Sequence, residues 1–222
     1  MPIPSSGTIK FSDFYAPPPP VFDFSMIHDQ ASQYGTYSSK SYTNPFTSGN
    51  GRLVVIYNQT ASLGYRGDFQ LDNISLGGTT YGFESSSDGF QHIKKTVGYP
   101  YWFPTDAESV KSIWDQWEDG SADDGWLEVP YAGHSGDQGT YGGWQRYTSN
   151  TPSSSTGIYN GASGSYYLYT ETSYNRYATK ILRSPQFTFT SNQTISWYDG
   201  AYGSNMGTVS YTHLTLPTNR EV

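Results

Sequence analysis

Cysteine is absent from the 222-residue sequence, and charged residues make up only 14% of it. The missing cysteines exclude a disulfide framework, a thiolate zinc site and a cysteine nucleophile. The net charge of −7 and the single adjacent lysine pair, Lys94-Lys95, argue against nucleic acid as a partner, because binding to phosphates requires clustered basic residues. The longest apolar run covers only residues 53–57, so no membrane insertion is expected.

Aromatic residues and glycine are abundant instead. Aromatics reach 17% of the chain and include 21 tyrosines, and there are 24 glycines. This balance is unlike that of disordered chains, which are poor in aromatics, and unlike that of coiled coils, which need many Ala, Glu, Lys and Leu residues. Short segments of alternating polarity, separated by Gly, Asn or Ser-Pro turns, predict β-strands near 51–57, 67–76, 165–172, 178–183, 186–190 and 193–198.

The segment 67–76 has the clearest strand pattern. Its alternation predicts that Phe69, Leu71, Ile74 and Leu76 face the core, with a slip at Asp72-Asn73 that predicts a β-bulge. Residues 64–67 predict a hairpin connection between this strand and the strand at 51–57.

One short helix is expected within this β-rich pattern. Thr105 and Glu108 have the spacing of a capping box, and apolar residues then recur at helical intervals up to Trp117 before Gly120. The predicted fold class is therefore all-β, an antiparallel jelly-roll β-sandwich with a helix inserted near 105–119 and a small N-terminal β segment.

Several motifs resemble the MAM domain, the extracellular jelly roll of meprins and receptor-type tyrosine phosphatases, which has a concanavalin-like sandwich. Residues 81–90 resemble its beginning. Residues 144–157 are similar to its W-x-R-x-x-x-x-T-P-S-x-x-T-G stretch, 164–173 to G-x-Y-L-Y-x-E-x-S, 178–185 to A-x-L-x-S-P, and 197–208 to F-x-Y-x-M-Y-G-x-x-M-G-x-L. The resemblance implies a jelly roll over residues 80–208 that lacks its last strands.

One further motif stands out of order. Residues 67–75 are similar to the G-D-I-A-L-D-D-I-S strand that closes a MAM domain, yet here they precede the other motifs. Either they end a shortened first repeat, or the jelly roll is permuted and this strand pairs with that of Phe83. We favour a separate small β unit over residues 21–79 that packs on the main domain.

The two ends of the chain are expected to lie outside this domain. Residues 4–13 resemble the P-S-S-G-x-I-x-x-S-D start of bacteriophage tail and other structural proteins, and 17–20 are a run of prolines, so 1–20 are predicted to be a docking segment and spacer. Residues 209–218 resemble translated sequencing adapter, as in a truncated metagenomic reading frame, so 209–222 are expected to be non-native, although they also alternate as a strand would.

Catalytic chemistry finds little support. His28, His92 and His134 lack the sequence context of a hydrolase triad. Glu84, Glu128, Glu171, Asp68 and Asp72 are available as paired carboxylates, but the compact E-x-D-x-x-E strand of jelly-roll glycosidases is missing. The sequence therefore assigns no catalytic residue and leaves the ligand-binding residues unknown.

A structural calcium ion is the one cofactor that the resemblance implies. Carboxylate and backbone oxygens suit calcium, and the resemblance points to Glu84 joined by Asp72. The alternative for Glu84 is a carboxylate bonded to backbone amides.

The expected function is that of a non-catalytic phage virion structural or adhesion protein. Its jelly roll would present a surface to a host glycan or surface protein. Tyrosines near 159–177 are candidate stacking platforms, although core or cross-strand packing is favoured for any single one. The N-terminal segment would contact other virion proteins, with a homo-oligomer as a further expectation. It would be made in the host cytoplasm and carried on the tail or capsid surface. The alternatives are a bacterial cell-surface adhesion module and a glycan-cleaving jelly-roll enzyme.

Overall fold

The computed structural model describes residues 22–23, 29–30, 35–43, 48–58, 65–93, 126–129, 131, 143–172 and 179–216. In this part of the chain the regular elements are all β-strands, and they form two antiparallel sheets. The all-β prediction is therefore confirmed for the described residues. None of these residues belongs to a helix that is long and apolar enough to cross a membrane. The helix predicted at 105–119 lies outside the described residues.

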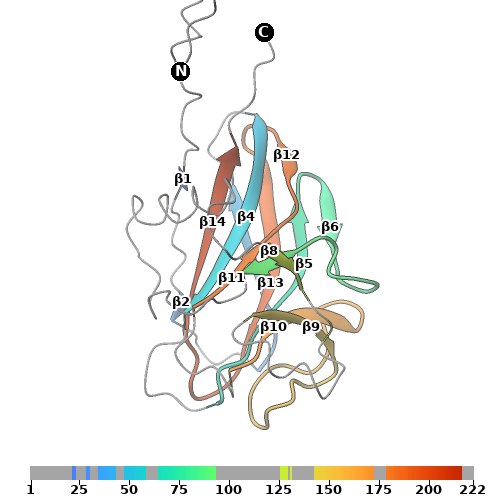
Figure 1. Ribbon diagram of the computed structural model, residues 1–222, viewed down its shortest axis with the longest axis vertical. Helices are drawn as coiled ribbons and strands as arrows, with labels where there is room; N and C mark the ends of the chain where they lie inside the picture. Colours follow the sequence, from blue (N-terminus) through green and yellow to red (C-terminus); the bar gives the residue numbers. More distant parts are fainter. Residues whose placement is uncertain are drawn as a thin grey trace, which may run out of the picture.

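The first sheet is built around the long strand β4. Its order is β1-β14-β4-β11-β7-β8, with β2 on β14 and β12 on β4. In Figure 1, β4 and β14 run side by side along the long axis of the molecule. The bounds are β1 Phe22–Asp23, β2 Asp29–Gln30, β4 Gly49–Asn58, β7 Gln91–Ile93, β8 Trp126–Glu128, β11 Thr179–Arg183, β12 Phe187–Phe189 and β14 Thr208–Leu216.

The second sheet has the order β3-β13-β5-β10-β9, with β6 paired to β5. Its central strand β5 therefore pairs with residues as far as 132 positions later in the chain, since Phe69 lies opposite Ala201. The bounds are β3 Ser38–Thr43, β5 Phe69–Leu76, β6 Thr79–Tyr81, β9 Trp144–Thr148, β10 Tyr166–Thr170 and β13 Thr194–Ala201.

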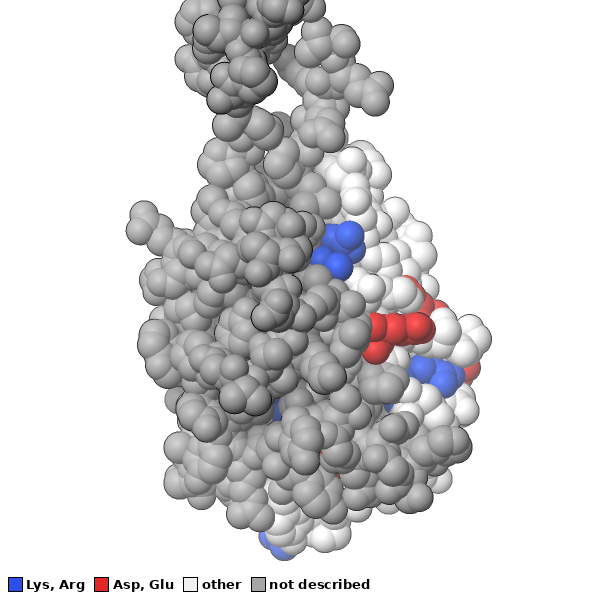
Figure 2. Space-filling view, in the orientation of Figure 1, with Lys and Arg blue, Asp and Glu red and all other residues white. Residues whose placement is uncertain are grey.

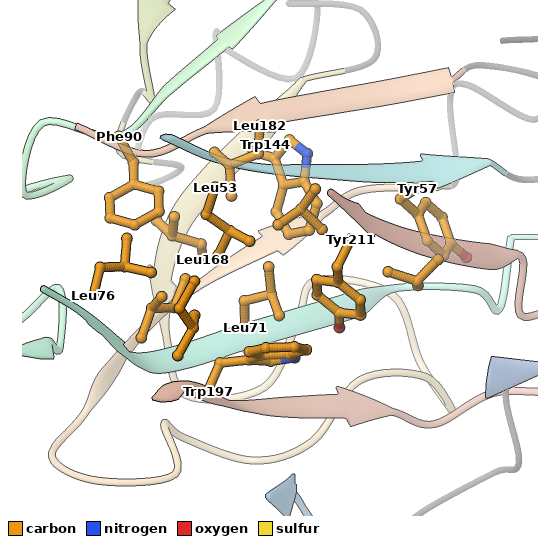
Figure 3. Close-up of a cluster of buried hydrophobic side chains, with 14 of the residues drawn as sticks. Leu53, Tyr57, Leu71, Leu76, Phe90, Trp144, Leu168, Leu182, Trp197 and Tyr211 are labelled. Carbon is orange, nitrogen blue, oxygen red and sulfur yellow. The ribbon is translucent and has the colours of Figure 1, made fainter. Parts of the chain in front are cut away.

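The core lies between the two sheets and is filled by alternate residues of both. The strand period of two directs Leu53, Val55 and Tyr57 of β4 inward from the first sheet. In Figure 3, side chains from strands of both sheets point toward one another, among them Leu182 of β11 in the first sheet and Leu71 of β5 in the second. Each of these two is at most 2% exposed, so truncating either to alanine should destabilise the fold by about 2–5 kcal/mol.

The β-bulge predicted at Asp72-Asn73 is confirmed. Along β5 and β13 the register shifts between Ser196, opposite Ser75, and Tyr198, opposite Asp72. Asn73 has a φ of 47°, in the left-handed region that Asn tolerates better than most residues. The bulge keeps Phe69, Leu71, Ile74 and Leu76 all in the core, as predicted.

The hairpin predicted at residues 64–67 is wrong. Strand β4 belongs to the first sheet and β5 to the second, so the connection between them passes from one sheet to the other. Alternation shows which side of a strand is buried but not which strand lies beside it, and this is why the prediction failed.

The expected division between residues 21–79 and 80–208 is also wrong for the described strands. Strands β3, β4 and β5 come from the first range, yet they pair with β13, β11 and β10 of the second. Strand β5 also pairs with β6, which ends at Tyr81, whereas Phe83 lies in no strand, so the permuted jelly roll stays a prediction. The two ranges share both sheets and one core.

Residues 209–216 belong to the fold, contrary to the expectation that 209–222 lie outside it. They extend β14, which pairs with β4 from Thr208 opposite Asn58 to Leu216 opposite Asn50. The side chains of Val209 and Tyr211 are buried in the core. Strand pairing uses backbone groups that every non-proline residue carries, so an alternating segment fits here whatever its origin, and the adapter origin stays a prediction.

Candidate functional site

The second sheet has an outer face that is covered over one half and open over the other. The cover is the segment between β9 and β10, residues 149–165, which we call the covering loop and which forms the ochre loops at the lower end of Figure 1. It lies on the outward residues of β5, since Gln70 and Asp72 alternate with the core residues and are nevertheless fully buried.

Hydrogen bonds from β5 fasten the covering loop along its length. The amide of Asp68 donates to Thr156 Oγ1 over 3.0 Å. Gln70 Nε2 donates to the carbonyl of Ile158 over 2.9 Å, and the Ile158 amide donates back to Gln70 Oε1. Because each side chain binds backbone groups, the loop is held in one register against the strand.

The two carboxylates of the predicted cation site bind the end of the same loop. Asp72 accepts hydrogen bonds from the amides of Asn73, at 2.7 Å, and Ser163, at 3.1 Å. Glu84 Oε1 accepts from the amides of Ser165 and Tyr166, both at 3.0 Å. The structure therefore brings Asp72 and Glu84 to one place, as the sequence predicted.

Glycines let the backbone approach these carboxylates. A Cβ atom at Gly164, whose φ is +75°, would lie 2.3 Å from Glu84 Oε1. A Cβ atom at Gly161 would lie 2.7 Å from Asp72 Oδ2. The close approach shows that both carboxylates are packed directly on the main chain of the covering loop.

Burial sets the electrostatics of this pair. It raises the pKa of Asp72 from its ordinary 3.8 to about 6, opposed by the amide hydrogen bonds and assisted by the nearby charge of Glu84. Each carboxylate already binds at least two backbone N–H groups, and the described residues contain no group of three Asp, Glu, His or Cys side chains that would hold a metal ion. Both carboxylates thus act as anchors for backbone amides, and the calcium site at Asp72 and Glu84 stays a prediction.

Arg146 of β9 completes the anchor of Glu84. Its Nε donates to the carbonyl of Phe83 over 2.5 Å and its Nη2 to the carbonyl of Glu84 over 2.7 Å. The guanidinium carbon lies 3.7 Å from the ring centroid of Tyr166, a cation–π contact. Residues 83–84 are therefore held from two sides, by β9 and by the start of β10.

A second polar cluster, which sequence reasoning missed, lies between the sheets. Lys180 of β11 is fully buried, and its Nζ donates to the carbonyl of Glu171 over 2.6 Å. Asp68 accepts from the amide and hydroxyl of Thr172, at 3.1 and 3.0 Å, while its Oδ2 has no hydrogen-bond partner among the described residues. The sequence indicated that Lys180 points inward, because it precedes the inward Leu182 by two residues and side chains two apart in a strand lie on the same face.

Burial and neighbouring charges shift the pKa values of both Asp68 and Lys180. Burial raises the pKa of Asp68, and the charge of Glu171 raises it further. Burial lowers the pKa of Lys180, while the negative charges of Asp68 and Glu171 oppose that change. An acid and a base are thus held in the interior, joined through the Glu171–Thr172 peptide group.

Of the remaining candidate residues, His92 of β7 and Glu128 of β8 lie on paired strands, one register position apart. His92 is 2% exposed, its Nδ1 has no partner among the described residues, and burial lowers its pKa to about 4. Glu128 of β8 accepts a hydrogen bond from Ser87, and Glu171 accepts one from Ser153. His28 and His134 lie outside the described residues.

The open half of the second sheet is lined by hydroxyl groups. Ser41 of β3, Ser196 of β13, Ser75 of β5 and Thr80 of β6 stand directly opposite one another in register. They face outward, because the intervening residues of β13, Ile195 and Trp197, are in the core. We call the eight residues of this surface the hydroxyl face: Ser39, Ser41, Thr43, Ser75, Thr80, Thr194, Ser196 and Tyr198.

The tyrosines expected to be stacking platforms divide into buried and exposed ones. Tyr167 and Tyr169 of β10 are at most 1% exposed, so they belong to the covered half of the sheet. Tyr159 of the covering loop is 64% exposed, and Tyr198 and Tyr202 are 39% and 40% exposed. On the side shown in Figure 2, charged side chains of the described residues form a few separate groups on a mostly uncharged surface.

Comparisons of the chain with protein-family models, with curated proteins and with solved structures find no match.

Proposed function

We propose that this chain is a non-catalytic adhesion protein of a phage particle, in which the β-sandwich presents a binding surface to a glycan or protein of the host. The N-terminal resemblance to phage tail proteins supports the virion assignment. The sandwich would be a MAM-like jelly roll with a permuted strand order. Support comes from the motif-bearing residues, since 151–157 lie in the covering loop, 166–170 form β10 and 179–183 form β11.

The observation that carries the proposal is the fastening of the covering loop to β5. Side chains of Gln70, Asp72 and Glu84 bind backbone groups of the loop at three successive places. A surface fixed in this way loses little conformational entropy when a ligand binds, and that is a requirement of an adhesive surface. Tyr159 of the covering loop lies exposed on this fastened region and offers rigid contact area.

The virion assignment is tested by locating the protein. Peptides of this chain should be found by mass spectrometry in purified virus particles from the source sample, in constant ratio to particle proteins through a density gradient. Recovery with bacterial envelopes alone would contradict the proposal and favour a bacterial cell-surface adhesion module.

The absence of catalysis is tested on the purified chain. Binding to isolated host envelopes should persist for hours without release of soluble sugar. Release of reducing ends that stops in Glu84→Gln or Glu171→Gln would contradict the proposal and favour a glycan-cleaving enzyme.

A further inference from the structure

We infer that the hydroxyl face is the binding site for an extended, uncharged polysaccharide, with Tyr198 as the residue on which a sugar ring stacks. This inference rests on the proposed function and assigns it to one half of one sheet. The other half, under the covering loop, has no exposed sheet residues to offer, since Gln70, Asp72, Tyr167 and Tyr169 are all at most 1% exposed.

The hydroxyl face is a regular array. Strand pairing places Thr43 opposite Thr194, Ser41 opposite Ser196, and Ser39 opposite Tyr198, and the middle row continues through Ser75 to Thr80. Neighbouring strands are about 4.8 Å apart, and outward residues repeat about every 6.8 Å along a strand. The spacing across the strands is similar to the length of one sugar unit, so a polysaccharide laid along a row meets a hydroxyl at each unit.

The chemistry of these side chains matches that of a neutral sugar. A hydroxyl group both donates and accepts hydrogen bonds, as the hydroxyls of a sugar do. None of the eight residues carries a charge. Asp72, the cross-strand neighbour of Tyr198, is buried and bound by the amides of Asn73 and Ser163, and Asp199, the next residue of β13, is buried and accepts a hydrogen bond from the Tyr211 hydroxyl. Sulfated polymers and nucleic acids would find no basic side chain on the array to neutralise them.

Tyr198 supplies the apolar contact. Its side chain is 39% exposed, and its cross-strand neighbours on either side are Ser39 and Asp72, neither of which is bulky enough to cover an aromatic ring. Two residues further along β13, a Cβ atom at Gly200 would lie 2.8 Å from Ile158 of the covering loop, so the open array ends there. A ring at the border of a polar array orients the bound chain.

A protein partner fits this surface less well. Protein interfaces have an apolar, closely packed centre, whereas Tyr198 is the one apolar contact among the eight residues of the array. The same argument disfavours a second copy of this chain.

The test is affinity electrophoresis of the purified chain in gels that contain mannan, xylan, dextran or soluble starch, with dextran sulfate as the charged comparison. Migration should be retarded by at least one neutral polymer, and the retardation should survive high salt. Tyr198→Ala should weaken binding about tenfold, and Ser41→Glu should abolish it, because the charge would be desolvated against the sugar.

Two matched controls keep the test specific. Tyr202→Ala removes an equally exposed tyrosine of the same chain, 40% against 39%, and Ser191→Glu adds a charge at an exposed turn; both should bind as the unmodified chain does. All four variants should retain the melting temperature of the unmodified chain, since the substituted side chains are exposed.

Three results would overturn the inference. They are retardation by dextran sulfate alone, binding that is unchanged in Tyr198→Ala and Ser41→Glu, and a concentration-dependent dimer that Ser41→Glu dissociates. If no polymer binds while the chain still adheres to host envelopes, the hydroxyl face is refuted as the site and the proposed function stands. If envelope binding also fails, the proposed function fails with it.

Discussion

Replacing Asp72 with asparagine should remove a pH dependence from the stability of this protein. Asp72 is fully buried, and its pKa is raised from 3.8 to about 6, chiefly by burial. The folded state therefore binds the proton more tightly than the unfolded chain does. Stability from this group is complete below the unfolded pKa and is lost as the pH rises through the folded pKa.

The size of the effect follows from the shift. The difference between 3.8 and about 6 is roughly 2 pH units, and at 1.36 kcal/mol per unit it amounts to about 3 kcal/mol. The measured quantity is the difference in free energy of unfolding between the unmodified chain and Asp72→Asn. This difference should fall by about 3 kcal/mol between about pH 4 and about pH 7. Asp72→Asn also loses one amide acceptor, which lowers its stability by about 1–3 kcal/mol at every pH.

Urea unfolding followed by tryptophan fluorescence at stepped pH measures both quantities. Taking the difference between the two proteins cancels the titration of His92 and Asp68, which both retain. Ser191→Ala, at an exposed turn and without a titratable side chain, serves as the control and should run parallel to the unmodified chain. Parallel curves for Asp72→Asn and the unmodified chain would refute the buried, amide-bound carboxylate.

Three further outcomes are expected. Gly164→Ala should lower the free energy of unfolding in urea by about 1–3 kcal/mol, because the new Cβ would lie 2.3 Å from Glu84 Oε1. Gly78 also has a positive φ but has open space around it, so Gly78→Ala should lower the free energy of unfolding less. Equal losses in the two variants would contradict the close contact. Lys180→Met should lower the free energy of unfolding more at pH 8 than at pH 5, because at pH 8 Asp68 must ionise in the interior without a positive neighbour. An equal loss at both pH values would contradict this explanation. Glu84→Ala should lower the melting temperature equally in calcium and in EDTA if the carboxylate anchors amides; a loss confined to calcium would instead establish a calcium site.

Local patterns in the sequence determined the character of the strands. Alternation over 67–76 predicted which four residues enter the core and where the bulge falls, because the direction of a strand side chain depends only on its position within a period of two. The resemblance also singled out Asp72 and Glu84 together, and they anchor the same loop.

Only the tertiary structure decided which strands are neighbours and which outward residues are covered. Gln70 and Asp72 occupy outward positions that a sequence pattern assigns to solvent, and they are buried because the covering loop lies on them. Ser41, Ser75 and Ser196 are far apart in the chain and form one row because β3, β13 and β5 pair in that order. Periodicity is a property of a short segment, whereas pairing depends on contacts between distant ones, and backbone hydrogen bonds are nearly the same for every partner.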